Sequence, residues 1–195
     1  LDCKSPNVNI YVEGYNCLHL AAMMKDHRCL KLLLQHKWIQ ENIDMPIDLP
    51  ETHQREGEGT TALHLAVSNK RYANVFLLIK EMPKARWPQK RSKRRTEEEE
   101  NDDYMFISSA NVNKKSASGS TPLHIAVSLC DYIMVKILLA ANSDILIQDA
   151  NGKTPLDLAL EYQHANNIKK QSLQKSKDDE IDDIVNALQK ADCDD

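Results

Sequence analysis

One arrangement of apolar and polar residues occurs four times along the chain. Each copy opens with Gly, has Leu at its fifth place and Ala at its eighth, and is followed by a second apolar block sixteen residues after the Gly. Apolar residues three and four places apart form one face of a helix, so each copy predicts two short helices joined by a turn. The copies begin at Gly14, Gly59, Gly119 and Gly152, and the second blocks contain Leu30, Val75, Val135 and Ile168.

The start of each copy has residues suited to the entry of a helix. Gly adopts positive φ without steric penalty, so it fits the turn before the helix. Thr61 and Thr121 are placed to cap the first helix, and Pro122 suits its first turn. The fifth-place Leu is expected in the core and the eighth-place Ala where helices approach closely. His occupies the sixth place in three copies, as His19, His64 and His124. We expect these histidines to bond to backbone groups and join one repeat to the next.

The phrases resemble the ankyrin repeat, which has a period of about 33 residues and contains a turn and two antiparallel helices. The resemblance rests on Thr-Pro-Leu-His at 121–124, Thr-Ala-Leu-His at 61–64, Asn-Cys-Leu-His at 16–19 and Thr-Pro-Leu-Asp at 154–157. It implies an all-α ankyrin-repeat solenoid of about four helix–turn–helix repeats. These repeats are placed near residues 14–36, 59–81, 119–141 and 152–170, within one domain that spans 1–174.

The spacing between copies predicts two long inserted loops, at joints 37–58 and 82–110, because the first two intervals exceed the ankyrin period. Residues 175–195 are acidic, and Ile181, Ile184, Val185 and Leu188 recur at helical spacing. A helix that caps the last repeat is one interpretation of this segment, and a free acidic tail is the other. The chain begins with Leu1 rather than Met, which leaves open that it is a fragment with further repeats upstream.

Composition narrows the classes of function. The net charge of −4 does not favour nucleic-acid binding, and no apolar run approaches the about 20 residues that span a membrane. The five cysteines show no CxxC spacing, which favours reduced thiols in a cytoplasmic and/or nuclear protein over a metal site. No phosphate-binding loop, GxSxG or HExxH motif is present. We therefore expect no catalytic residue, cofactor, metal or small-molecule substrate within this chain.

The remaining expectation is a surface that binds protein partners. In ankyrin proteins the hairpin tips and the exposed face of the first helix bind partners, and the matching positions here are candidates; the alternative for each is an ordinary exposed residue. The candidates are Met23, Met24, Lys25, Asn69, Lys70, Arg71, Lys114, Lys115, Leu129, Asp131 and Tyr162. Met and Tyr are suitable anchors for an interface.

The second joint contains a basic run that is followed directly by acids. Its residues Lys90, Arg91, Lys93, Arg94 and Arg95 form a candidate nuclear-import patch. The alternative is a solvated loop whose basic side chains pair with the acids that follow.

Two ankyrin families resemble the chain more specifically. GYNCLHLAA and GTTALHLAV are similar to repeats of the inhibitor-of-NF-κB (IκB-like) group, which often carries an acidic tail and would imply a Rel-type transcription factor as partner. The joints 37–58 and 82–110 depart from that family. GYNCL and ILIQDANGKTPLDLAL are similar to the ankyrin stack of mind bomb-type ubiquitin ligases, which would imply a partner-recognition region whose ligase chemistry lies in flanking domains.

Overall fold

The computed structural model describes residues 14–47, 59–79, 109–170 and 178–193, and these residues contain nine helices. In chain order the helices are α1 (Cys17–Met23), α2 (Arg28–Leu33), α3 (Lys37–Glu41), α4 (Ala62–Ser68), α5 (Tyr72–Ile79), α6 (Pro122–Ser128), α7 (Tyr132–Ala140), α8 (Pro155–Lys170) and α9 (Asp178–Cys193). Joint 82–110, apart from its last two residues, lies outside the described part of the chain, as do residues 48–58 of joint 37–58.

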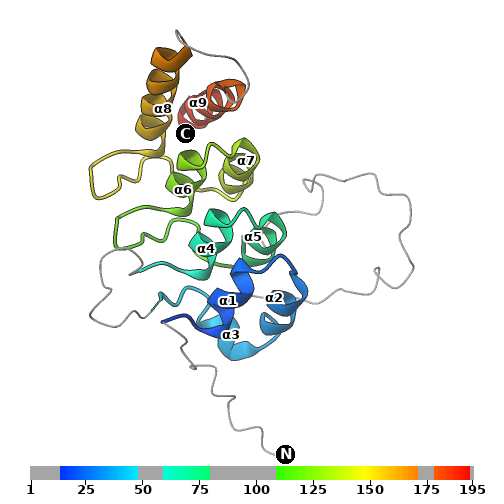
Figure 1. Cartoon of the computed structure of the whole chain (residues 1–195). Coiled ribbons are helices and arrows are strands. Elements are labelled where there is room, and N and C mark those ends of the chain that lie inside the picture. Colours follow the sequence, from blue (N-terminus) through cyan, green and yellow to red (C-terminus); the bar gives the residue numbers. More distant parts are fainter. Residues whose placement is uncertain (1–13, 48–58, 80–108, 171–177, 194–195) are drawn as a thin grey trace, which may run out of the picture.

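The helices form two parallel rows that run the length of the molecule. The first helices α1, α4, α6 and α8 stack in one row, and α2, α5, α7 and α9 form the second (Figure 1). Each first helix contacts the next one in its row, including across both joints, so the inserted sequence does not interrupt the stack. The predicted all-α solenoid is therefore confirmed.

The core lies between neighbouring repeats, as expected for units that cannot bury an apolar face alone. The fifth-place residues Leu18, Leu63 and Leu123 are at most 1% exposed. The eighth-place Ala66 and Ala126 are fully buried, which allows the small side chain to bring adjacent first helices close together. The stability of the array is therefore a property of its interfaces.

Gly119 shows why the repeat opens with Gly. Its φ is +69°, in a region that L side chains rarely adopt, and a Cβ at this position would lie 2.5 Å from the backbone nitrogen of Ala150 in the next hairpin. Gly152 has a similar φ of +74°, but a Cβ there would meet nothing within 4 Å. Gly119 therefore serves both the turn and the close approach of two repeats, and Gly152 serves the turn alone.

Joint 37–58 was expected to be a loop throughout, but part of it is helical. It contains the short helix α3, which lies at the N-terminal end of the stack beside α1 and α2 (Figure 1). Ile39, Ile43 and Ile47 are all buried, and the first two belong to the main core. Only Ile39 lies within α3, and Ile43 and Ile47 follow that helix, so their spacing of four residues marks buried positions in the joint and not one continuous helix.

The fourth repeat also differs from the prediction. Residues 155–170 form the single helix α8, so Ile168 lies in that helix and not in a second helix of its own. In repeats two and three, Lys70 and Cys130 take φ of +55° and +50° and end the first helix, whereas α8 continues past the equivalent Gln163. The place of the second helix is taken by α9, which packs against α7 and α8.

The C-terminal segment is a capping helix, and the interpretation as a free tail is wrong for residues 178–193. Ile181, Ile184, Val185 and Leu188 are at most 5% exposed, and the side-chain amide of Gln163 donates to the Asp182 carboxylate at 2.7 Å. One face of α9 is thus buried against the end of the stack and the other is polar, as the last element of a solenoid requires.

Candidate binding surface

The repeated histidines join neighbouring repeats and are inaccessible to ligands. Nδ1 of His64 accepts from the backbone N–H of Thr61 at 3.2 Å, which leaves the ring proton on Nε2. That Nε2–H donates to the carbonyl oxygen of Ser120 in the next repeat at 3.2 Å. The equivalent bond runs from His124 to Lys153 at 3.1 Å, whereas His19 bonds to the carbonyl of Met45 in joint 37–58 at 2.9 Å. The expected bonds to backbone groups are confirmed for all three histidines, and the link to the next repeat is confirmed for His64 and His124.

Each of these rings is held in its neutral form. Burial lowers the pKa of His64 to about 4, and it lowers the pKa of His19 and of His124 as well. Protonation would place a proton on Nδ1, the atom that accepts from the helix N-cap, so it would break the cap as well as charge a buried ring. The three histidines therefore stabilise the stack only while neutral.

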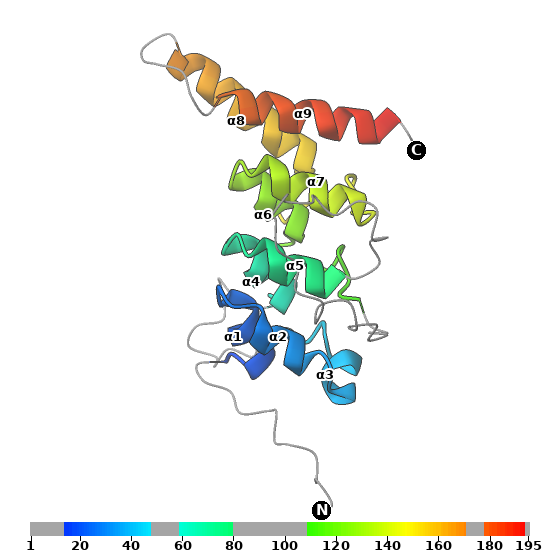
Figure 2. The same cartoon turned by 90° about the vertical axis from the view of Figure 1, so that its right-hand side faces the viewer.

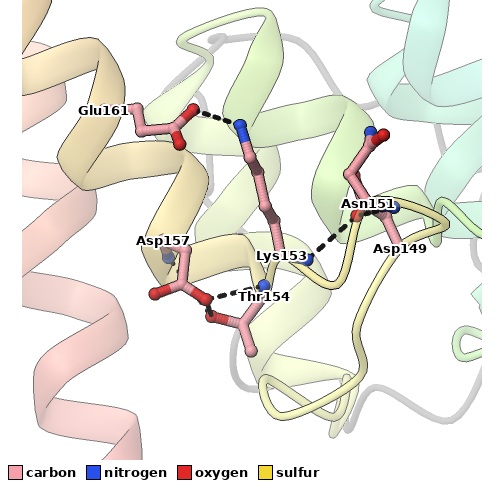
Figure 3. A network of polar contacts seen from close by, with 6 residues as sticks. All are labelled: Asp149, Asn151, Lys153, Thr154, Asp157 and Glu161. Atoms are coloured by element: carbon pink, nitrogen blue, oxygen red, sulfur yellow. Dashed lines mark hydrogen bonds and ion pairs between the residues drawn. The ribbon is translucent and has the colours of Figure 1, made fainter.

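Asp157 replaces the histidine in the last repeat. It still caps the first helix of that repeat, but among the described residues it makes no bond to a further repeat. Its carboxylate accepts from the backbone N–H of Thr154 at 2.9 Å and from the Thr154 hydroxyl at 2.7 Å (Figure 3). These bonds lower the pKa of Asp157. A carboxylate has no hydrogen to pass on to a further repeat. Beside it, Nζ of Lys153 pairs with Glu161 at 2.7 Å, so the hairpin turn and α8 are linked across this end of the stack (Figure 3).

The turns between first and second helices lie one above the other along one edge of the stack (Figure 2). The turn of repeat one is held by repeat two: Nε–H of Arg71 donates to the Met23 carbonyl at 2.8 Å. The buried side-chain amide of Asn74 donates to the carbonyls of Ala22 and Met24, both at 2.9 Å. The residues after α1 are therefore fixed in place by the second repeat.

Most of the predicted surface residues reach solvent, but to different extents. Met24 is 47% exposed and Tyr162 is 38% exposed, and Lys25, Lys70, Lys114 and Lys115 are also exposed. Met23, Asn69, Arg71 and Leu129 are half-buried. The side-chain amide of Asn69 donates to the Leu65 carbonyl at 2.9 Å, so this residue also caps α4.

Asp131 is a correction, because it was expected on the exposed surface and is only 5% exposed. It caps α7 by accepting from the Met134 N–H at 3.0 Å, and it accepts from the Tyr72 hydroxyl at 2.6 Å. Lys70 Nζ lies 3.8 Å from its carboxylate. Burial, reinforced by the bond to Asp131, raises the pKa of Tyr72 to about 12. Asp131 thus joins repeats two and three and offers no free carboxylate to a partner.

Leu20 was not among the predicted surface residues, but its side chain is 43% exposed. It lies four residues before Met24, the C-cap residue of α1, a spacing at which side chains on a helix are neighbours. Equivalent places on the other first helices are also mostly apolar and make what we call the first-helix stripe. Its members are Leu20, Met24, Leu65, Ile125, Leu129, Leu158 and Tyr162. The stripe is most exposed at its two ends, since Leu65 in the middle is only 9% exposed.

Three other kinds of functional feature are relevant to this chain: a nuclear-import patch, a metal site and a membrane-spanning helix. The candidate import patch, Lys90 to Arg95, lies outside the described residues. No cluster of three His, Cys, Asp or Glu side chains that could hold a metal ion occurs among the described residues. None of the described helices is long and apolar enough to cross a membrane.

Comparison with known families agrees with this geometry. A model of ankyrin repeats in three copies matches residues 1–87, and a model of ankyrin repeats in many copies matches residues 107–159. The chain belongs to the ankyrin-repeat family. Ankyrin repeats act as protein-interaction modules and are generally non-catalytic scaffolds, so binding of protein partners follows from the family.

The relatives of this ankyrin-repeat chain differ widely in kind. A fowlpox virus protein named for ankyrin repeats is 50% identical over 56 residues, which cover 29% of the chain and 30% of that protein. The tyrosine-protein kinase HTK16 of Hydra vulgaris is 31% identical over 157 residues, 76% of the chain and 20% of the kinase. The chicken nuclear factor NF-kappa-B p105 subunit is 27% identical over 186 residues, 80% of the chain and 18% of that protein.

The chain spans less than a third of the length of each of these relatives. A match over a fifth of a kinase brings no kinase chemistry to this ankyrin stack. What the relatives share with the chain is the repeat architecture.

Proposed function

We propose that the first-helix stripe is the docking surface for a protein partner, with Leu20 and Met24 as its apolar anchors. The observation that carries this proposal is that two large apolar side chains, 43% and 47% exposed, lie four residues apart, Leu20 on α1 and Met24 at its C-cap. Large apolar side chains that are exposed together, rather than singly, mark interaction sites. The bonds from Arg71 and Asn74 hold this turn in place before a partner arrives, which reduces the ordering that binding requires.

The finer proposal is an IκB-like regulator that binds a Rel-type transcription factor. It is supported by the IκB-like phrases and by the similarity to the p105 subunit, which extends over 80% of the chain. The continuous row of first helices supports it too, because the inserted joints leave the stack of described helices unbroken. Such a regulator would act by occupying its partner, without chemistry of its own.

The alternative is the partner-recognition region of a larger mind bomb-type ubiquitin ligase. This proposal rests on GYNCL near Gly14 and on the closing phrase near residues 145–160. Both proposals use the same stripe and differ in the flanking domains: a zinc-binding RING domain downstream would support the ligase, and phosphorylatable serines in an upstream arm would support the inhibitor.

Localisation to the cytoplasm and/or nucleus is a further part of the proposal, with residues 90–95 as the import signal. Deleting that segment from a fluorescently tagged chain should lower the nuclear fraction measured by microscopy. A nuclear fraction that does not change would remove the import role.

The docking proposal is tested by measuring binding of a purified Rel-type DNA-binding region to the immobilised chain. Burying a Leu or Met side chain is worth about 1.5–3 kcal/mol, so the Leu20→Ser/Met24→Ser variant should bind at least about tenfold more weakly. Leu32→Ser is the matched control, because Leu32 is 66% exposed but lies on the second helix α2. No binding by the unmodified chain would rule out the IκB-like role, and equal losses in both variants would rule out the stripe.

A further inference from the structure

We propose that the partner segment bound beside these anchors is acidic, with interspersed apolar side chains, and that it lies along what we call the turn edge. The turn edge is defined as residues 23–25 and 69–71, the helix-to-helix turns of the first two repeats. The inference rests on the proposed docking surface and adds the chemistry of its occupant.

The turn edge presents positive charge to solvent. Lys25 and Lys70 are exposed, and the half-buried Arg71 is a third cation, next to Lys70 on the second turn. Among the described residues, the Arg71 guanidinium donates from Nε to the Met23 carbonyl, at 2.8 Å. Three cations therefore lie on two adjacent turns, in a chain whose net charge is −4.

The described carboxylates near this edge are already engaged. Asp26 pairs with Arg28, with 2.7 Å between Oδ2 and Nη2. Asp131 is 5% exposed and accepts from the Tyr72 hydroxyl and from the Met134 N–H at the N-cap of α7, and its carboxylate lies 3.8 Å from Nζ of Lys70. Neither carboxylate is free to turn outward and neutralise Lys25 at the surface. The charge of Lys25 and Arg71 is thus available to a partner, whereas that of Lys70 is partly balanced by Asp131, and the complementary partner is an anion.

The adjoining surface is apolar, which decides what kind of anion fits. Leu20 and Met24 are both more than two-fifths exposed; Met24 directly precedes Lys25 in the chain, and Leu20 comes four residues before Met24. A segment with Asp or Glu side chains interspersed with large apolar ones complements both the basic turns and the apolar surface beside them. Charge pairs speed the encounter, and a buried apolar side chain supplies affinity. Single-stranded nucleic acid would use the cations but needs aromatic side chains for stacking, and the turn edge has none.

The two turns are also fixed relative to one another, so the positive edge exists before binding. Arg71 and Asn74 bond to the carbonyls at the end of α1, and Lys70 has a backbone φ of +55° that ends α4 and opens its turn. An extended segment would thus meet a rigid pattern of apolar and basic side chains.

The test is a selection of random 12-residue peptides displayed on phage, using the full chain as the target. We expect the enriched peptides to carry net negative charge and at least one large apolar side chain. Synthetic copies labelled with fluorescein are then titrated by fluorescence polarisation at 50 and 300 mM NaCl. Affinity should fall with salt, as it does for exposed charge pairs. Enrichment of neutral or basic peptides, or no enrichment, would overturn the proposal.

Variants separate this inference from the docking proposal. Lys25→Glu/Lys70→Glu should weaken binding of the selected peptides by about tenfold or more, since charge complementarity steers association. Lys136→Glu, an exposed lysine on the second helix α7, is the control and should change binding less than about twofold. Melting temperatures of all variants, measured by circular dichroism, verify that each remains folded.

The outcomes differ clearly. If Leu20→Ser/Met24→Ser weakens peptide binding and the double charge reversal does not, the docking surface stands and the acidic partner is wrong. If neither affects binding, both are wrong. A single-stranded 20-nucleotide DNA that displaces the peptides and binds as tightly as they do would reassign the edge to nucleic acid.

Discussion

The neutral histidines make the stability of the stack depend on pH in a way that can be calculated for His64. This side chain is fully buried and its pKa is lowered from 6.5 to about 4. A histidine whose pKa is lowered on folding contributes stability above its unfolded pKa and loses it as the pH falls toward the folded pKa. The window of loss for His64 therefore runs from about pH 6.5 to about pH 4.

The magnitude follows from proton linkage. With pKa values of 6.5 unfolded and about 4 folded, the free energy of unfolding should fall by about 2 kcal/mol at pH 5 and about 3 kcal/mol at pH 4, relative to pH 7.5. The carboxyl groups of Asp149 and Asp157 have pKa values lowered from 3.8. Their contribution is present above pH 3.8 and is lost below it. They therefore titrate mainly after His64.

The assay compares the unmodified chain with His64→Gln by urea denaturation at pH 7.5, 6, 5 and 4. Gln can donate to the Ser120 carbonyl from its amide but does not titrate, so the variant should be less stable at neutral pH and lose less between pH 6.5 and 4. His19, His124 and the acids act equally in both proteins and cancel in the difference. If the two stabilities fall in parallel across this range, His64 is not held neutral by the stack and the reasoning is refuted.

Three further predictions concern contacts that hold the stack together. Gly119→Ala should lower the melting temperature more than Gly152→Ala, because both meet an unfavourable φ but only the former forces two backbones apart. Ile39→Ala should destabilise the chain by about 2–5 kcal/mol in urea denaturation, and no loss would mean that α3 does not belong to the core. Asp131→Ala and Tyr72→Phe should be non-additive in a double-mutant cycle, whereas additive losses would contradict their bond.

The local features of the repeat were predictable from sequence because each is set within a few residues. A positive φ needs Gly at positions such as Gly119, and a hydroxyl one residue before the helix caps it, as Thr121 does. The role of His64 followed from its recurrence at one place of successive repeats. These features depend on covalent geometry and short-range hydrogen bonds, and each copy of the phrase supplies the same ones.

The errors arose where a residue's environment is set by distant parts of the chain. Asp131 follows a helix turn and was expected to be exposed, but it is covered by Tyr72 from the preceding repeat, 59 residues earlier. Leu20 was not singled out, because an apolar residue in a helical phrase is normally placed in the core. Its position on the open face of α1 is evident only once the helices are packed.

The amino-acid sequence by itself determined the repeating unit, its two helices, its caps and turns, and hence an ankyrin solenoid. Tertiary structure alone decided that α9 serves as the partner of the long helix α8, that α3 closes into the core, and that basic side chains gather at the first two turns. The reason is physical: hydrogen bonds and dihedral preferences act over a few residues and are written in each phrase. Burial and surface charge depend on which side chains of other repeats lie nearby, and stacking is what brings those side chains together.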